Sequence, residues 1–249
     1  MTQDILIGAE PYSHQGGSSG VLVLHGFTGN PSSLRSIAEL AADKGFSVEL
    51  PRLPGHGTNV EDMMTTTWAD WTQSAEAAYL DLASRCERVA IVGLSMGGSL
   101  TAYLAERHDG LAGCVFINPF VKSPAAEIVE GLDALLDAGL ETLDSIGSDI
   151  KKEGGLESSY DATPLAAAKS LFAGISGVND DLSRITCPVL LLSSREDHVV
   201  TTDNGDDLVE KVRGPVERVW LENSYHVATL DNDQALVESL TLDFLVRVL

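Results

Sequence analysis

The chain has 249 residues, a length that fits one large domain or one domain carrying an insertion. Hydrophobic residues make up 44% of the chain, which is enough for a buried core and excludes a largely disordered protein. The 16 basic and 37 acidic residues give a formal net charge of −21. This charge disfavours nucleic acid and anionic membrane surfaces as partners, because binding either one requires concentrated Lys and Arg.

Short apolar runs rich in Val, Ile and Leu alternate with longer amphipathic stretches. Six runs are predicted strands: 21–24, 47–50, 88–93, 114–117, 189–193 and 216–221. Five amphipathic stretches are predicted helices: 32–44, 67–84, 96–107, 202–212 and 233–248. Several of the strands are apolar at nearly every position, which is typical of a parallel sheet covered on both faces. The alternation therefore predicts an α/β fold with a mostly parallel central sheet and helices on both faces.

Residues 121–181 interrupt this alternation, because they contain no convincing strand. Acidic amphipathic segments such as 125–136 occupy the stretch, and glycines at 147 and 154–155 divide it. A structureless connection of this length is uncommon in a compact domain. We therefore expect a core made of residues 1–120 and 182–249, and a small helical cap, or lid, made of residues 121–181.

The strongest functional signal is the segment VAIVGLSMGG at 89–98. It consists of a buried strand, then G-x-S-x-G, then a helix that begins at Met96. This arrangement is typical of a serine nucleophile, because a sharp turn between strand and helix exposes the Ser95 hydroxyl beyond the sheet. Gly93 and Gly97 keep the turn small enough for the strand and helix to approach each other.

A serine hydroxyl needs a base to remove its proton, so the site requires an imidazole. His226 is the candidate, because it lies in a loop between the last predicted strand and the last predicted helix. Asp197 is the predicted carboxylate that orients this imidazole; Glu196 competes on the same loop, but the shorter side chain suits a rigid loop apex. The order Ser95, Asp197, His226 agrees with that of known triads on α/β sheets. The other histidines are interpreted as structural, surface or flanking residues: His14, His25, His56, His108 and His198.

Two backbone N–H groups are predicted to form an oxyanion hole. One belongs to Met96, the residue after the nucleophile, and the other to Phe27 in the loop HGFTG at 25–29. Each such donor typically contributes about 10²–10³ in rate. The chain has no glycine-rich phosphate-binding motif after a strand, so no cofactor is expected.

The three cysteines, Cys86, Cys114 and Cys187, are widely spaced and form no CxxC pair. We therefore expect neither a metal site nor a disulfide framework, but small buried side chains in a reducing compartment. Residues 1–4 contain no basic segment of a signal peptide, and apolar runs such as 21–24 are too short to span a membrane. A cytoplasmic protein without an integral membrane segment is expected.

Four further segments resemble those of bacterial monoacylglycerol lipases and the related small thermostable carboxylesterases of the α/β-hydrolase superfamily. They are PRLPGHGT at 51–58, DSIGSD at 144–149, EDHVV at 196–200 and NSYHVATLD at 223–231. The resemblance implies a compact cap over an apolar acyl tunnel, with a polar end that receives glycerol. It also implies that Glu157 contacts the glycerol hydroxyls and that Ile146 lines the pocket near them. The alternatives are a solvated charge for Glu157 and plain packing within the cap for Ile146.

The combined prediction is a serine hydrolase that cleaves monoacylglycerols to free fatty acid and glycerol through an acyl-enzyme on Ser95. The alternative is a broad-specificity carboxylesterase for short- and medium-chain esters, without a preference for glycerol. A thioesterase or a carbon–carbon bond hydrolase could use the same groups, and a non-catalytic ligand sensor could share the fold. Epoxide hydrolases and dehalogenases are disfavoured, because those relatives carry Asp where this chain has Ser95. The cap is expected to make transient contact with lipid surfaces.

Overall fold

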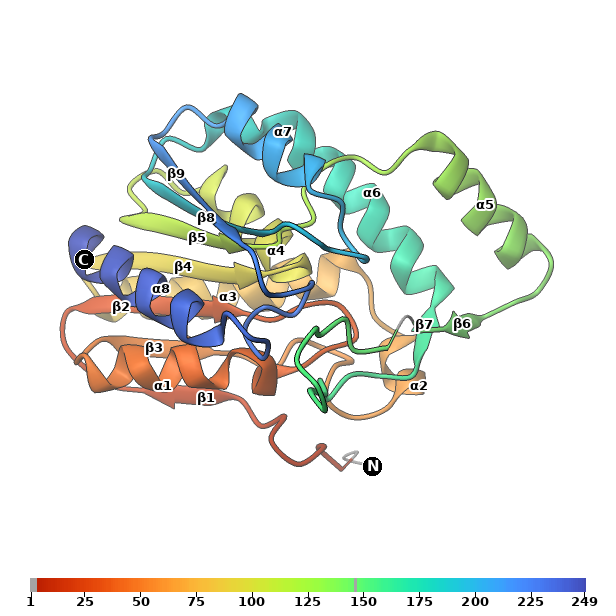
Figure 1. The fold of residues 1–249 in the computed structure, drawn as a ribbon, viewed down its shortest axis with the longest axis horizontal. Helices are drawn as coiled ribbons and strands as arrows, with labels where there is room; N and C mark the ends of the chain where they lie inside the picture. Colours follow the sequence, from red (N-terminus) through yellow and green to blue (C-terminus); the bar gives the residue numbers. More distant parts are fainter. Residues whose placement is uncertain (1–3, 146) are drawn as a thin grey trace.

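The computed structural model describes residues 4–145 and 147–249, and a β-sheet lies at its centre (Figure 1). Within these residues the sheet has seven strands in the order β1-β3-β2-β4-β5-β8-β9. All neighbouring pairs are parallel except β1 and β3. The strands are β1 (Tyr12–His14), β2 (Ser19–Leu24), β3 (Ser47–Leu50), β4 (Arg88–Leu94), β5 (Gly113–Ile117), β8 (Val189–Ser194) and β9 (Val216–Leu221).

The predicted α/β fold with a mostly parallel sheet is confirmed. Each of the six predicted strands is present, and their ends agree with the prediction to within two residues. The sequence does not predict β1, because three residues at a sheet edge are too few to show an alternating pattern.

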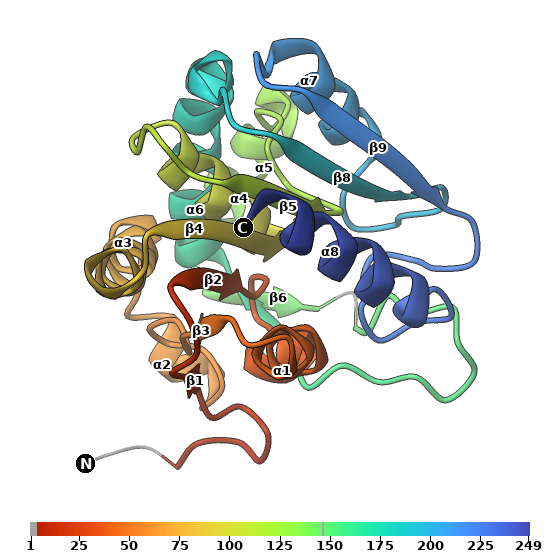
Figure 2. The ribbon, with the colours of Figure 1, turned by 90° about the vertical axis from the view of Figure 1, so that its left-hand side faces the viewer.

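Helices cover both faces of the sheet (Figure 2). Val21 and Val23 of β2 join the core formed with α1 and α8, whereas Leu22 and Leu24 join the core formed with α3, α4, α6 and α7. Successive side chains of one strand thus enter different cores, as expected for a sheet buried on both faces. The helices are α1 (Arg35–Asp43), α2 (Val60–Met63), α3 (Trp68–Arg85), α4 (Met96–Ala105), α6 (Leu165–Asp181), α7 (Asp203–Lys211) and α8 (Gln234–Val248).

Residues 121–181 combine helices with a small sheet. Helix α5 (Ala126–Asp137) packs against α6 and stands away from the central sheet (Figure 1), while α6 lies against α3 and α4. Strands β6 (Thr142–Asp144) and β7 (Ala162–Pro164) pair with each other antiparallel. The sequence pattern predicts a helical segment here, with the stretch 125–136 close to α5, but it does not predict these strands, because each has only three residues.

The carboxyl ends of β2, β4, β8 and β9 lie at the same edge of the sheet, because these strands run parallel. The segments that leave this edge carry Phe27, Ser95, Asp197 and His226, in that order. Helix α5 and strands β6 and β7 lie beyond the same edge (Figure 1), whereas α6 packs against α3 and α4. In the described part of the chain, no helix has both the length and the apolar character needed to cross a membrane.

Candidate active site

Ser95 occupies a strained turn between β4 and α4. Its backbone has φ 56° and ψ −118°. Residues other than glycine rarely adopt a positive φ. A Cβ on Gly97 would lie 1.9 Å from the carbonyl oxygen of Leu24, and one on Gly93 would lie 2.2 Å from the carbonyl oxygen of Gly97. The turn is therefore so tight that glycine is required on both sides of Ser95.

The loops after β8 and β9 bring Asp197 and His226 together. Nδ1 of His226 and Oδ2 of Asp197 are 2.8 Å apart, and both side chains are buried. The other carboxylate oxygen of Asp197 accepts two backbone N–H groups of its own loop, at 2.9 and 2.7 Å. Glu196 instead pairs with Lys151 at the surface, with 3.4 Å between the charged atoms. Because the carboxylate holds the proton on Nδ1, Nε2 of His226 is left as the basic nitrogen.

The charges around His226 favour its protonated form. Burial lowers the pKa of the imidazole, but the charge and hydrogen bond of Asp197, together with the charges of Glu157 and Asp149, raise it. The net shift is upward from the usual value of 6.5. A more basic imidazole is better suited to accept a proton from a serine hydroxyl.

The backbone amides of Phe27 and Met96 have no hydrogen-bond acceptor among the described residues. Met96 is the first residue of α4, where N–H groups have no partner within the helix. The loop of Phe27 passes close to the nucleophile turn, since a Cβ on Gly26 would lie 3.4 Å from Cβ of Ser95. Two unpaired donors near Ser95 could stabilise the negative oxygen of a tetrahedral intermediate.

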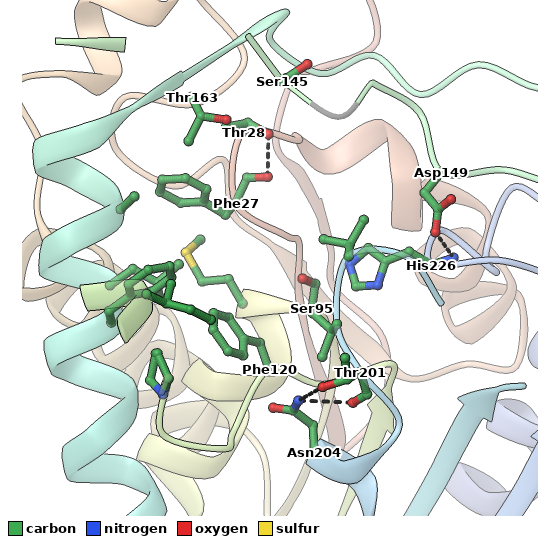
Figure 3. Close-up of a pocket in the computed structure, with 18 of the residues that line it drawn as sticks. Phe27, Thr28, Ser95, Phe120, Ser145, Asp149, Thr163, Thr201, Asn204 and His226 are labelled. Atoms are coloured by element: carbon green, nitrogen blue, oxygen red, sulfur yellow. Dashed lines mark hydrogen bonds between the residues drawn. The ribbon is translucent and has the colours of Figure 1, made fainter. Parts of the chain in front are cut away.

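A pocket of about 700 Å³ opens at these groups, and Ser95, Met96, Phe27 and His226 all line it. In Figure 3 the Ser95 side chain and the His226 ring both lie at the pocket wall. The volume of the pocket is within the range of sites that bind small molecules. Much of the remaining wall is apolar and includes Phe120, Ile128, Leu171, Phe172, Val199 and Val200.

Glu157 contributes a carboxylate to this pocket. Its backbone N–H donates to Oγ of Ser148 at 2.9 Å, which anchors the segment. Burial raises the pKa of the Glu157 carboxyl, and the charge of His226 opposes this shift. In the described residues no donor hydrogen-bonds the Glu157 carboxylate, so it is free to accept from a ligand. Ile146, the other residue expected near the glycerol end, lies outside the described residues.

One edge of the sheet thus carries the nucleophile turn, the Asp197–His226 pair and the two unpaired amides. A family model matches most of this chain. That model, described as "Alpha/beta hydrolase family", matches residues 21–239. The chain belongs to the alpha/beta hydrolase family.

Similar proteins support the narrower resemblance. The thermostable monoacylglycerol lipase of Bacillus sp. (strain H-257) is 44% identical over 247 residues, 98% of this chain and 96% of the relative. The carboxylesterase of Bacillus subtilis (strain 168) is 26% identical over 98% of both chains. A solved structure described with LipS and LipT, two metagenome-derived lipolytic enzymes, has a TM-score of 0.93 and 42% identity, covering 98% of this chain and all (100%) of that chain. The resemblance to bacterial monoacylglycerol lipases and small carboxylesterases is confirmed.

Two other histidines of this alpha/beta hydrolase are buried beside the site. His25 has Nδ1 3.0 Å from the carbonyl oxygen of Gly26, and its Nε2 accepts the N–H of Leu53 at 3.1 Å. Burial, followed by the nearby His56, lowers the pKa of His25 to about 3. Burial also lowers the pKa of His56 to about 4. Both rings therefore stay neutral and have a structural role. Within the described ranges, no group of three His, Cys, Asp or Glu side chains could hold a metal ion.

Sequence reasoning missed Asn118, which supports the His226 loop of this alpha/beta hydrolase. Asn118 directly follows β5 and has φ 41°. Its Nδ2 donates to the carbonyl oxygen of His226 at 2.7 Å, and its Oδ1 accepts the N–H of Ser194 at 2.7 Å. The signal that could have found it is its position, a polar residue directly after an apolar strand at the carboxyl edge of the sheet. Sequence reasoning also missed the role of Asp149, which is described below.

Proposed function

We propose that this alpha/beta hydrolase cleaves monoacylglycerols into a free fatty acid and glycerol. The observation that supports the proposal most is the unpaired Glu157 carboxylate in a largely apolar pocket that also contains Ser95. An apolar wall suits an acyl chain, and a buried carboxylate suits the hydroxyl groups of an alcohol. The 44% identity to a thermostable monoacylglycerol lipase agrees with this assignment.

In the proposed mechanism, Nε2 of His226 removes the proton of the Ser95 hydroxyl while Oγ attacks the ester carbonyl carbon. The resulting oxyanion accepts hydrogen bonds from the amides of Phe27 and Met96. The imidazolium gives its proton to the departing glycerol oxygen, which leaves an acyl-enzyme on Ser95. His226 then activates a water molecule that attacks the acyl carbonyl, and fatty acid release restores the hydroxyl. Asp197 holds the imidazole in the required tautomer throughout.

In this proposal Glu157 accepts hydrogen bonds from the glycerol hydroxyls, and the role expected for Ile146 stays a prediction. Residues 121–181 serve as the cap, since Ile128 of α5 and Phe172 of α6 line the pocket together with residues of the core. The cytoplasmic location stays a prediction.

The preference for glycerol is tested with a chain-length series of 1-monoacylglycerols and the matched methyl and p-nitrophenyl esters. At a pH where His226 is neutral in both enzymes, we expect higher kcat/KM for the glyceryl esters, and we expect Glu157→Gln to lower it about 10- to 100-fold for these substrates alone, because hydrogen bonds to a charged group are lost. Glu153→Gln is the matched control, because Glu153 is exposed on the same segment. Equal rates for all alcohols, unaffected by Glu157→Gln, would indicate a general carboxylesterase, the activity named for the relative at 26% identity.

We also propose that the cap contacts lipid surfaces. Apolar side chains of this segment are exposed, among them Leu143 at 41% and Leu156 at 82%. The net charge of −21 favours surfaces without net negative charge. Leu143→Ser combined with Leu156→Ser is expected to weaken binding to phosphatidylcholine vesicles about 10- to 100-fold in a flotation assay. Val246→Ser on α8, at 57% exposure, is the control; equal binding by both variants would argue against the contact.

A further inference from the structure

Asp149 is a buried carboxylate that the proposed mechanism does not use. It closes the segment DSIGSD at 144–149, is 9% exposed, and lines the pocket. Oδ2 accepts the backbone N–H of His226 at 3.0 Å and that of His198 at 3.1 Å. Oδ1 lies 2.7 Å from Nδ1 of His198. A single side chain thus hydrogen-bonds the loops that carry both Asp197 and His226. In Figure 3 the bond to His226 is the dashed line that starts at the labelled Asp149.

The main chain of Asp149 holds the same loop. Its carbonyl oxygen accepts the N–H of Val227 at 3.1 Å, so both the side chain and the backbone of Asp149 bond the His226 loop. The segment itself is anchored by Asp231, whose carboxylate accepts the N–H groups of Lys151 and Lys152 at 2.7 and 2.8 Å. Asp149 is therefore held in a fixed position relative to the base.

We propose that Asp149 is a positioning residue for catalysis: it aligns the His226 base with Asp197 by bonding both of their loops from the pocket-lining segment 147–160. The proposal rests on the proposed function of Ser95, Asp197 and His226. Loops are the most mobile parts of a fold, and a base displaced by about 1 Å can cost about 10²-fold in rate. Bonds to a charged acceptor are stronger than neutral ones, which suits a carboxylate for this role.

The negative charge of Asp149 also acts on His226. Together with Asp197 and Glu157 it raises the pKa of the imidazole. The other charged groups around Asp149 are His198, whose pKa Asp149 raises, and Glu196, which pairs with Lys151. Removing the charge of Asp149 while keeping its shape should therefore lower the pKa of the base.

The test uses two substitutions and a readout that needs no ester substrate. The rate at which a fluorophosphonate probe labels Ser95 depends on the activated serine but not on glycerol recognition. Asp149→Ala removes all the side-chain acceptors, and we expect about 10- to 100-fold slower labelling and lower kcat, with KM within about threefold of wild type. Asp149→Asn keeps an oxygen for the two backbone N–H groups, so we expect it to recover most of this loss.

The pH profile separates positioning from simple structural support. For Asp149→Asn, we expect the acid limb of the labelling rate to move to lower pH, because one of the charges that raises the pKa of His226 is removed. Asp144→Asn is the matched control, since Asp144 is exposed on β6, and it should label as the wild type does. A folded Asp149→Ala enzyme that labels at the wild-type rate would overturn the proposal. If Asp149→Ala does not fold, an unshifted acid limb in Asp149→Asn overturns it instead. Absence of labelling in the wild type would refute the proposed function itself.

Discussion

Ser95→Ala is expected to lower kcat for monoacylglycerol hydrolysis by about 10⁶-fold, because the substitution removes the only atom that forms the acyl-enzyme. The fold should be unaffected. The turn is held by main-chain bonds, from Ser95 N–H to the carbonyl oxygen of Ile117 at 3.1 Å and from Gly98 N–H to the carbonyl oxygen of Ser95 at 2.8 Å. Fatty acid release by titration measures the loss, and thermal unfolding followed by circular dichroism verifies the fold.

His226→Ala provides an internal control for Ser95→Ala, because nucleophile and base act as one unit. The double variant should be no slower than either single variant, as expected for residues whose effects are not additive. Activity above about 1% of wild type in a purified Ser95→Ala enzyme would contradict the mechanism and would require another nucleophile.

Asp197→Asn is expected to lower kcat by up to about 10⁴-fold with little change in structure. The amide of asparagine would donate to Nδ1 of His226, which lies 2.8 Å from Oδ2 of Asp197. The imidazole would then carry its proton on Nε2 and could not accept the one from Ser95. Glu196→Gln, on the same loop, is the matched control and should retain wild-type activity, because Glu196 contacts Lys151 at the surface.

The Asp197→Asn variant also tests how kcat/KM depends on pH. His226 must be neutral to act as a base, and its pKa lies above 6.5 in the folded protein. Wild-type kcat/KM should therefore decline as the pH falls through a value above 6.5. Asp197 is the strongest of the groups that raise this pKa, so the acid limb of Asp197→Asn should move to lower pH. An acid limb at the same pH in both enzymes would indicate that another group controls the rate.

Much of the fold follows from local patterns. The strands that form the centre of the sheet are apolar at nearly every position, and burial on both faces produces such runs in a parallel sheet. The sequence does not predict β1, β6 and β7. A strand of three residues is too short to show an alternating pattern, and its pairing depends on a partner strand far along the chain. Helix α2 has four residues and is likewise too short to be predicted.

The sequence by itself determined the nucleophile turn, because G-x-S-x-G between strand and helix is a local requirement for a residue at φ 56°. It also determined the order in which Ser95, Asp197 and His226 follow their strands, and the parallel fold that brings those strand ends to one edge. The sequence also favoured Asp197 over Glu196, and the contact of Asp197 with His226 agrees with that choice. The tertiary structure alone decided that the Glu157 carboxylate is unpaired in the pocket, and that Asn118 and Asp149 support the His226 loop. These contacts join residues up to 108 positions apart, as between Asn118 and His226, so no local pattern encodes them. These contacts form only when folding brings the sheet, its loops and the 121–181 segment together at one site.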